Sequence, residues 1–249
     1  MVRYFSLFCY NFDGRSISLR RPGMPSFFPK LVVFDLDGTL IDYEHDYLFR
    51  EVLRIFDRFN LEQLSEQLLA THHERDDFFG WIECPQQRVT LERIFAEEFR
   101  EHDKPPARLL PGVLETLDFL ASRNVRLAIA TARAQLPESI REKLSHTGLL
   151  KWIDCIVARP SQKLQWRDKT LQIQVACNHA SVAPVDSYMV GDNPSDTTSA
   201  HAAGIGGIIA VRTGKVVEEL LKKAEPHVII DSVAEIPSLV RRYVGGSAL

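Results

Sequence analysis

The sequence predicts an α/β protein, in which a doubly wound (Rossmann-like) parallel sheet carries an inserted helical subdomain. Short apolar runs, such as residues 31–34 and 187–190, alternate with stretches of helical periodicity, which is typical of a parallel sheet covered on both faces. Acidic side chains follow directly after these two runs, where open α/β sheets bind their ligands. Between residues 43 and 105 the pattern is helical. We therefore predict a core of residues 31–42 and 106–249, with residues 43–105 as an inserted helical subdomain.

The composition is that of an ordinary globular protein. The chain has 249 residues, of which 45% are hydrophobic and 25% charged, and its net charge is -3. That charge argues against a nucleic-acid surface, and no apolar run approaches the roughly 18 residues of a membrane span. The 4 cysteines have no CxxC spacing, so neither a zinc site nor a disulfide framework is indicated. We expect a cytoplasmic protein without a nucleic-acid or membrane partner, and the sequence leaves its oligomeric state open.

Residues 1–30 are predicted to lie outside the fold. The apolar stretch over residues 4–10 is short for the core of a signal peptide, and no small-x-small cleavage site follows it. Arginines outnumber acids in this segment, which is faintly similar to a transit peptide. We expect a disordered extension, or an upstream start that precedes a natural one at Met24.

The first strong motif is Asp-Leu-Asp-Gly-Thr at residues 35–39. Alternate residues of an extended chain point to the same side, so we expect Asp35 and Asp37 to face one site. Gly38 lets the backbone turn sharply. A calcium loop is one alternative, but it requires glycine where this chain has Leu40, and a helix before the loop. A solvated turn is the other, and it is disfavoured because crowded carboxylates at the end of a buried strand repel each other.

The helical insertion offers several side chains that could contact a substrate. For each of them a solvent-facing or packing role is the alternative, because a lone charged residue on an amphipathic helix usually faces water. These candidates are His45, Arg50, Arg54, Trp81 and Glu83.

After the insertion the alternation of strands and helices resumes. Strands are predicted at residues 125–130, 154–157, 187–190, 207–211 and 228–230, with helices from about residues 113, 137 and 170 between them. Thr131 follows the first of these strands, and its place at the carboxyl end favours a functional role. Arg133 could contact a bound ligand or reach the inserted helices, but we expect it at the surface, as arginine usually is.

The second strong motif is Val-Gly-Asp-Asn-Pro-Ser-Asp at residues 190–196. We expect a strand to end here and a helix to begin, with Asn193 as its cap and Pro194 in its first turn. Asp192 then lies at the tip of a strand. Asp196 lies near a helix N-terminus, where an acid is often structural.

These motifs together resemble those of the haloacid dehalogenase superfamily, in its phosphatase branch. The resemblance spans roughly residues 31–240 and rests on Asp-x-Asp-Gly-Thr-Leu, on Thr131 and on Gly-Asp-x-x-x-Asp, in that order along the chain. The dehalogenating branch typically has tyrosine where this chain has Asp37. The chain is most similar to phosphoglycolate phosphatase-like enzymes that carry a helical cap.

The resemblance implies a role for each acid. Asp35 would attack phosphorus and form an aspartyl-phosphate. Asp37 would protonate the leaving oxygen and then deprotonate the hydrolytic water. Mg2+ would be bound by Asp35, by Asp192 and by the backbone carbonyl of Asp37. Asp196 would orient the site, and Gly38 would support it through the turn that it allows.

The resemblance also implies the groups that hold the phosphate. The hydroxyl of Thr131 and a lysine would bind its oxygens. We assign the lysine as Lys169, which opens a helix, with Lys163 as the alternative; the usual Lys-Pro pair is absent. A cap that closes over the site would favour a small phosphorylated metabolite as substrate.

The predicted function is thus a Mg2+-dependent phosphatase that acts on a small phosphomonoester. A sugar-phosphate mutase of the β-phosphoglucomutase type has similar motifs and is the alternative within the same class. A regulatory protein that kept the fold and lost the chemistry is less favoured, because none of Asp35, Asp37, Lys169 and Asp192 is missing.

Overall fold

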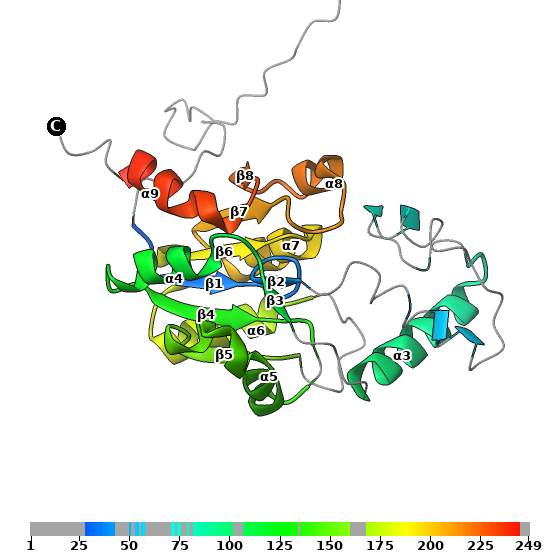
Figure 1. Cartoon of the computed structure of the whole chain (residues 1–249). Coiled ribbons are helices and arrows are strands. Elements are labelled where there is room, and N and C mark those ends of the chain that lie inside the picture. Colours follow the sequence, from blue (N-terminus) through cyan, green and yellow to red (C-terminus); the bar gives the residue numbers. More distant parts are fainter. Residues whose placement is uncertain are drawn as a thin grey trace, which may run out of the picture.

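The computed structural model describes residues 28–42, 50, 53–54, 56–57, 71–72, 74–75, 79, 82–101, 107–133, 135–159 and 168–244. In this part of the chain a 6-stranded sheet has the order β5-β4-β1-β6-β7-β8, and every neighbouring pair is parallel. Helices lie on both sides of the sheet (Figure 1). The predicted doubly wound α/β core is therefore confirmed.

The elements follow the chain in the expected alternation. The strands of the main sheet are β1 Leu31–Phe34, β4 Arg126–Ala130, β5 Cys155–Val157, β6 Ser187–Gly191, β7 Gly207–Val211 and β8 Val228–Ile230. The helices are α3 Pro85–Glu101, α4 Val113–Ala121, α5 Pro137–Leu144, α6 Thr170–Ala180, α7 Pro194–Ala203, α8 Glu218–Lys223 and α9 Ile236–Val244. Short 3-10 segments lie at Ser145–Thr147, Leu149–Lys151, Pro184–Asp186 and Val233–Glu235.

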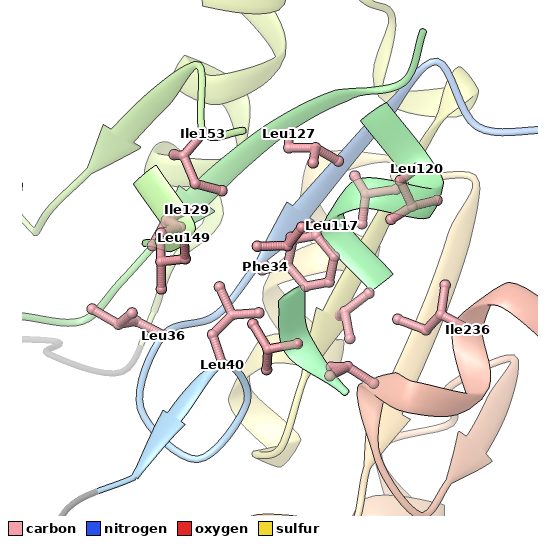
Figure 2. Close-up of a cluster of buried hydrophobic side chains, with 14 of the residues drawn as sticks. Phe34, Leu36, Leu40, Leu117, Leu120, Leu127, Ile129, Leu149, Ile153 and Ile236 are labelled. Atoms are coloured by element: carbon pink, nitrogen blue, oxygen red, sulfur yellow. The ribbon is translucent and has the colours of Figure 1, made fainter. Parts of the chain in front are cut away.

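Two apolar layers cover the sheet, because alternate residues of a strand point to opposite faces. Phe34 of β1 belongs to the layer that contains Leu117 and Leu120 of α4 (Figure 2). Val33, the preceding residue, belongs to the other layer, together with Ile173 of α6. Burial on both faces explains why β1 is an uninterrupted apolar run.

The register places the carboxyl ends of three strands side by side. β1 lies between β4 and β6, and Phe34 is aligned with Ile129 on one side and with Val190 on the other. The residues that follow these strands therefore meet at one edge of the sheet.

A small antiparallel ribbon lies where the chain leaves and re-enters the core. β2 (Ile41–Asp42) pairs with β3 (Arg108–Leu109), so both connections of the predicted insertion run together. Of the insertion itself the structure describes α3 and some separate residues. Glu74 is one of these, and its carbonyl accepts a hydrogen bond of 3.0 Å from the amide of Val217, next to α8. The rest of the predicted cap and the extension up to residue 27 lie outside the described residues.

No helix in the described part of the chain is long and apolar enough to cross a membrane.

The apolar layer between β1 and α4, which contains Leu117, contributes to the stability of the core. We expect Leu117→Ala, at a side chain with 0% exposure, to lower the free energy of unfolding by about 2–5 kcal/mol, because burial is lost and a cavity remains. Urea denaturation measures this loss. Val185→Ala is the control, since Val185 is 62% exposed, and it should stay within about 0.5 kcal/mol of the wild type. Equal losses in both variants would contradict this account of the core.

Candidate active site

Acidic residues from two strand ends meet at the carboxyl edge of the sheet. Asp35 follows β1 and Asp192 follows β6, while Asp196 lies in the first turn of α7. Carboxylate oxygens of these three residues all lie within 4.8 Å of one another. Asp35 and Asp196 are buried, at 5% and 1% exposure, and Asp192 is partly buried. Residues far apart in the sequence thus form one compact acidic cluster.

Lys169 supplies the positive charge of this cluster. Its Nζ lies 2.5 Å from an oxygen of Asp35 and 2.5 Å from an oxygen of Asp196. Its backbone amide donates to the hydroxyl of Ser199 in α7, at 2.9 Å, which fixes the start of α6 against α7. The structure therefore places Lys169 beside the predicted nucleophile, and Lys163 lies outside the described residues.

The cluster holds more negative charge than its lysine can neutralise. Burial raises the pKa of Asp35 to about 7, although Lys169 opposes this shift. Loss of hydration raises the pKa of Asp192 well above its ordinary value, and the charges of Asp35 and Asp196 add to the shift. Burial alone would lower the pKa of Lys169, but the attraction of Asp196 and Asp35 outweighs it and the pKa is raised. A divalent cation would relieve this repulsion.

The donor set fits Mg2+. This hard cation prefers carboxylate and carbonyl oxygens and is usually held by one or two protein carboxylates. Asp35 and Asp192 offer such oxygens next to each other. Asp196 is the third acid of the cluster, but Lys169 binds one of its oxygens and the amide of Asn193 donates to the other.

Asp192 is positioned by the turn that follows β1 and by a second loop. The hydroxyl of Thr39 donates to its carboxylate at 3.1 Å. Gly38 has a φ of 80°, and a Cβ on it would lie 2.5 Å from an Asp192 oxygen. A Cβ on Gly214, which follows β7, would collide with the same carboxylate. The hydroxyl of Thr213 donates to the carbonyl of Gly38 at 2.5 Å, so the two loops are joined around Asp192.

Asp196 is fixed by the capping of α7. The side chain of Asn193 accepts a hydrogen bond from the amide of Ser195 at 2.9 Å, and Asp196 accepts one from the amide of Asn193 at 3.1 Å. This reciprocal arrangement is a capping box. It holds one oxygen of Asp196 at the helix start and leaves the other against Lys169.

Thr131 lies at the tip of β4, buried at 1% exposure. Its amide donates to the carbonyl of Val157 at 3.0 Å, and its hydroxyl accepts from the amide of Arg133 at 3.2 Å. The short loop after β4 is thus anchored to β5 and folded back on Thr131.

The prediction that Arg133 lies at the surface is wrong. The residue is only 8% exposed, and its guanidinium binds both carboxylate oxygens of Asp37, at 2.8 Å and 2.5 Å. The prediction relied on the usual exposure of arginine. It could not take account of Asp37, which is 96 residues away in the sequence. A bidentate pair of this kind compensates the burial of the charge.

Asp35 and Asp37 form ion pairs with different basic side chains, although both follow β1. The strand ends at Phe34, and the chain then turns, with the amide of Leu40 donating to the carbonyl of Leu36 at 3.0 Å. Asp35 faces Lys169, whereas Asp37, whose side chain is 39% exposed, faces Arg133. Among the predicted metal ligands the structure thus brings the carboxylates of Asp35 and Asp192 together, and the predicted carbonyl contact of Asp37 remains a prediction.

The candidates from the insertion are only partly described. Arg50 and Glu83 are exposed, and Arg54 is partly buried. His45 and Trp81 lie outside the described residues. Their proposed contacts with a substrate remain predictions.

This geometry defines a class of protein. Buried carboxylates that converge with a lysine at the carboxyl edge of a parallel sheet have the chemistry to act as a nucleophile and could hold a divalent cation. Such a site suits an enzyme of phosphoryl transfer, where positioning and charge neutralisation are the main tasks.

Comparison with known proteins gives the family. Residues 32–211 match the haloacid dehalogenase-like hydrolases, and the chain belongs to this family. It is similar to the pyrophosphatase PpaX of Oceanobacillus iheyensis, at 26% identity over 212 residues, covering 85% of this chain and 96% of the relative. It is also similar to the phosphoglycolate phosphatase of Nitrosococcus oceani, at 23% identity over 229 residues, with coverage of 85% and 96%.

Solved structures show the same fold. A haloacid dehalogenase-like hydrolase from Streptococcus pneumoniae superposes with a TM-score of 0.66 at 19% identity, covering 85% of this chain and 98% of that one. The predicted family is confirmed, and with it the prediction of a phosphatase-type hydrolase.

The absence of a side chain at position 38 is a requirement of the acidic cluster. We expect Gly38→Ala to lower phosphatase turnover about 100-fold, because a Cβ there would displace the carboxylate of Asp192, and small misplacements in active sites have large effects. Gly148→Ala is the matched control: its φ is 76°, close to the 80° of Gly38, but nothing lies within 4 Å of a Cβ there.

Both substitutions carry the strain of a left-handed residue, which costs about 1–2 kcal/mol. Denaturation midpoints should therefore fall by similar amounts, while turnover falls only in Gly38→Ala. Full activity in Gly38→Ala would show that Asp192 tolerates displacement.

Proposed function

We propose that this chain is a Mg2+-dependent phosphatase that hydrolyses a small phosphomonoester through an aspartyl-phosphate on Asp35. The observation that carries the proposal is the position of the Asp35 carboxylate. It lies buried at the end of β1, within 4.8 Å of a ligand oxygen of Asp192 and 2.5 Å from the ammonium of Lys169. A carboxylate held between a lysine and a candidate cation site is set for attack on an anionic phosphorus centre.

In this mechanism an oxygen of Asp35 bonds to phosphorus while the bond from phosphorus to the leaving oxygen breaks. Asp37 donates a proton to that oxygen, so the product leaves as an alcohol. Asp37 then takes a proton from water, whose oxygen attacks the phosphorus and releases inorganic phosphate and the Asp35 carboxylate. The hydroxyl of Thr131 and the ammonium of Lys169 hold the phosphoryl oxygens throughout.

Asp35 and Asp192, with the backbone carbonyl of Asp37, are the residues that would hold the cation. When bound, Mg2+ supplies positive charge that neutralises the carboxylates and the transferring phosphoryl group. The names of the relatives, a pyrophosphatase and a phosphoglycolate phosphatase, support a small phosphorylated substrate.

The nucleophile assignment has a direct test. Asp35→Asn should reduce release of inorganic phosphate from p-nitrophenyl phosphate by at least about 1000-fold, because an amide cannot form the covalent intermediate. Asp118→Asn, at an exposed position of α4, is the control and should keep full activity. Retained turnover in Asp35→Asn would remove the assignment. Transfer of phosphate between two positions of a sugar, with little release to water, would instead indicate a mutase.

Removal of the metal tests the cation site. Treatment with EDTA should abolish turnover, and added Mg2+ should restore it. Asp192→Asn should raise the Mg2+ concentration for half-maximal activity by at least about tenfold. Loss of a residue that only supports a metal ligand typically lowers metal affinity by that factor, and loss of a ligand itself should lower it at least as much.

Thermal denaturation provides a second measurement of the same site. Mg2+ should raise the midpoint of the wild type, because a ligand that binds only the folded state stabilises it. The same concentration should shift Asp192→Asn less. Equal shifts in both proteins would place the cation elsewhere.

A further inference from the structure

The loop between β7 and α8 contacts two parts of the chain that lie far from it in the sequence. At its start, the hydroxyl of Thr213 donates to the carbonyl of Gly38, 175 residues away, at 2.5 Å. At its end, the amide of Val217 donates to the carbonyl of Glu74 at 3.0 Å, and Glu74 belongs to the predicted insertion. One short loop therefore contacts both the turn after β1 and the inserted segment.

The first of these contacts lies at the proposed cation site. Gly214, next to Thr213, approaches so closely that a Cβ on it would collide with the carboxylate of Asp192, and a Cβ on Gly38 would collide with the same group. The carbonyl of Asp37 belongs to the peptide that directly precedes Gly38. The position of the loop therefore bears on two proposed ligands, this carbonyl and the Asp192 carboxylate.

Ion pairs hold the two ends of the loop in place. The guanidinium of Arg212 lies 2.7 Å from a carboxylate oxygen of Glu218, the first residue of α8, and 2.6 Å from one of Asp231, which follows β8. The amide of Arg212 also donates to a carbonyl of β8 at 3.0 Å. A short segment with both ends fixed has little freedom to rearrange, so its two distant contacts depend on one another.

We propose that this loop links the inserted segment to the cation site, with Thr213 as the positioning residue. The loop holds the turn after β1 and the Asp192 carboxylate in place before the cation binds, and the hydrogen bond to Glu74 keeps the loop in that position. When either contact is lost, the cation has to order the loop as it binds, and its affinity falls. The inference rests on the proposed function, because it takes Asp192 and the carbonyl of Asp37 as ligands of Mg2+.

The hydroxyl of Thr213 can be removed with almost no change of shape. The measured quantity is the apparent Kd for Mg2+, obtained from the dependence of the thermal denaturation midpoint of the full-length chain on Mg2+ concentration. We expect Thr213→Val to raise this Kd about tenfold, because loss of a group that supports a metal ligand typically costs this factor or more. Thr213→Ser keeps the hydroxyl and should retain the Kd of the wild type.

A matched control removes the same kind of hydrogen bond elsewhere in the core. The hydroxyl of Thr116 in α4 donates to the carbonyl of Val233 at 2.9 Å. Thr116→Val should lower the midpoint at every Mg2+ concentration, since a hydrogen bond is lost, and should leave the Kd for Mg2+ unchanged.

The contact with the insertion has a test of its own. Val217→Pro removes the donor to Glu74 and keeps the backbone conformation, because Val217 has a φ of -63°, the value that proline requires. We expect the Kd for Mg2+ to rise about 2- to 10-fold, the usual worth of one hydrogen bond. Ala183→Pro is the control: its φ is -64°, and its amide donates no hydrogen bond within the described part of the chain. Its Kd should equal that of the wild type.

The outcomes separate this inference from the function on which it rests. An unchanged Kd in either Thr213→Val or Val217→Pro would overturn the link, while phosphate release and stabilisation by Mg2+ in the wild type would leave the proposed function intact. A similar rise of the Kd in Thr116→Val would reduce the effect to a general loss of stability and would also overturn the link. If Mg2+ neither stabilises the wild type nor restores its turnover after EDTA, the proposed function fails and the inference fails with it.

Discussion

The structure depends on one constraint, the repulsion among carboxylates that the sheet brings to a single edge. Parallel order places the ends of β1 and β6 side by side, and an aspartate follows each of them. Lys169 counters this repulsion by binding Asp35 and Asp196 at once. The same two acids compensate the burial of the lysine's own charge, so the buried lysine and the buried carboxylates stabilise one another.

Several features of the backbone serve this cluster. Gly38, Gly191 and Gly214 each lie where a Cβ would collide with Asp192 or Asp196. The turn after β1, the end of β6 and the loop after β7 therefore approach the acids closely because these positions lack a side chain. The capping box of α7 fixes the orientation of the Asp196 side chain. Local chain geometry and long-range electrostatics therefore favour the same arrangement, which is a mark of a well-specified site.

The sequence predicts the parts of this site that follow from local pattern. Apolar runs locate the strands, and the residues that end them include Asp35 and Asp192. Lys169 follows from its place before a helix and from family resemblance. The role of Gly214 could not be predicted, because its contact with Asp192 arises from the pairing of β6 with β7. The burial of Arg133 was missed for the same reason: average exposure describes a residue type, whereas a distant partner decides the individual case.

The different partners of Asp35 and Asp37 bear on how two carboxylates in one motif can have different tasks. Asp35 is surrounded by protein, and burial raises its pKa to about 7, so its charge depends on neutralisation by Lys169 and a cation. Asp37 lies two residues further on, is partly open to solvent and has a guanidinium partner. Carboxyl groups in unlike environments are what separate a nucleophile from an acid–base group on a single chain. Burial of Asp35, exposure of Asp37 and the pairing with Arg133 together make these environments unlike, so the loop after β4, which carries Arg133, would take part in the proposed division of roles.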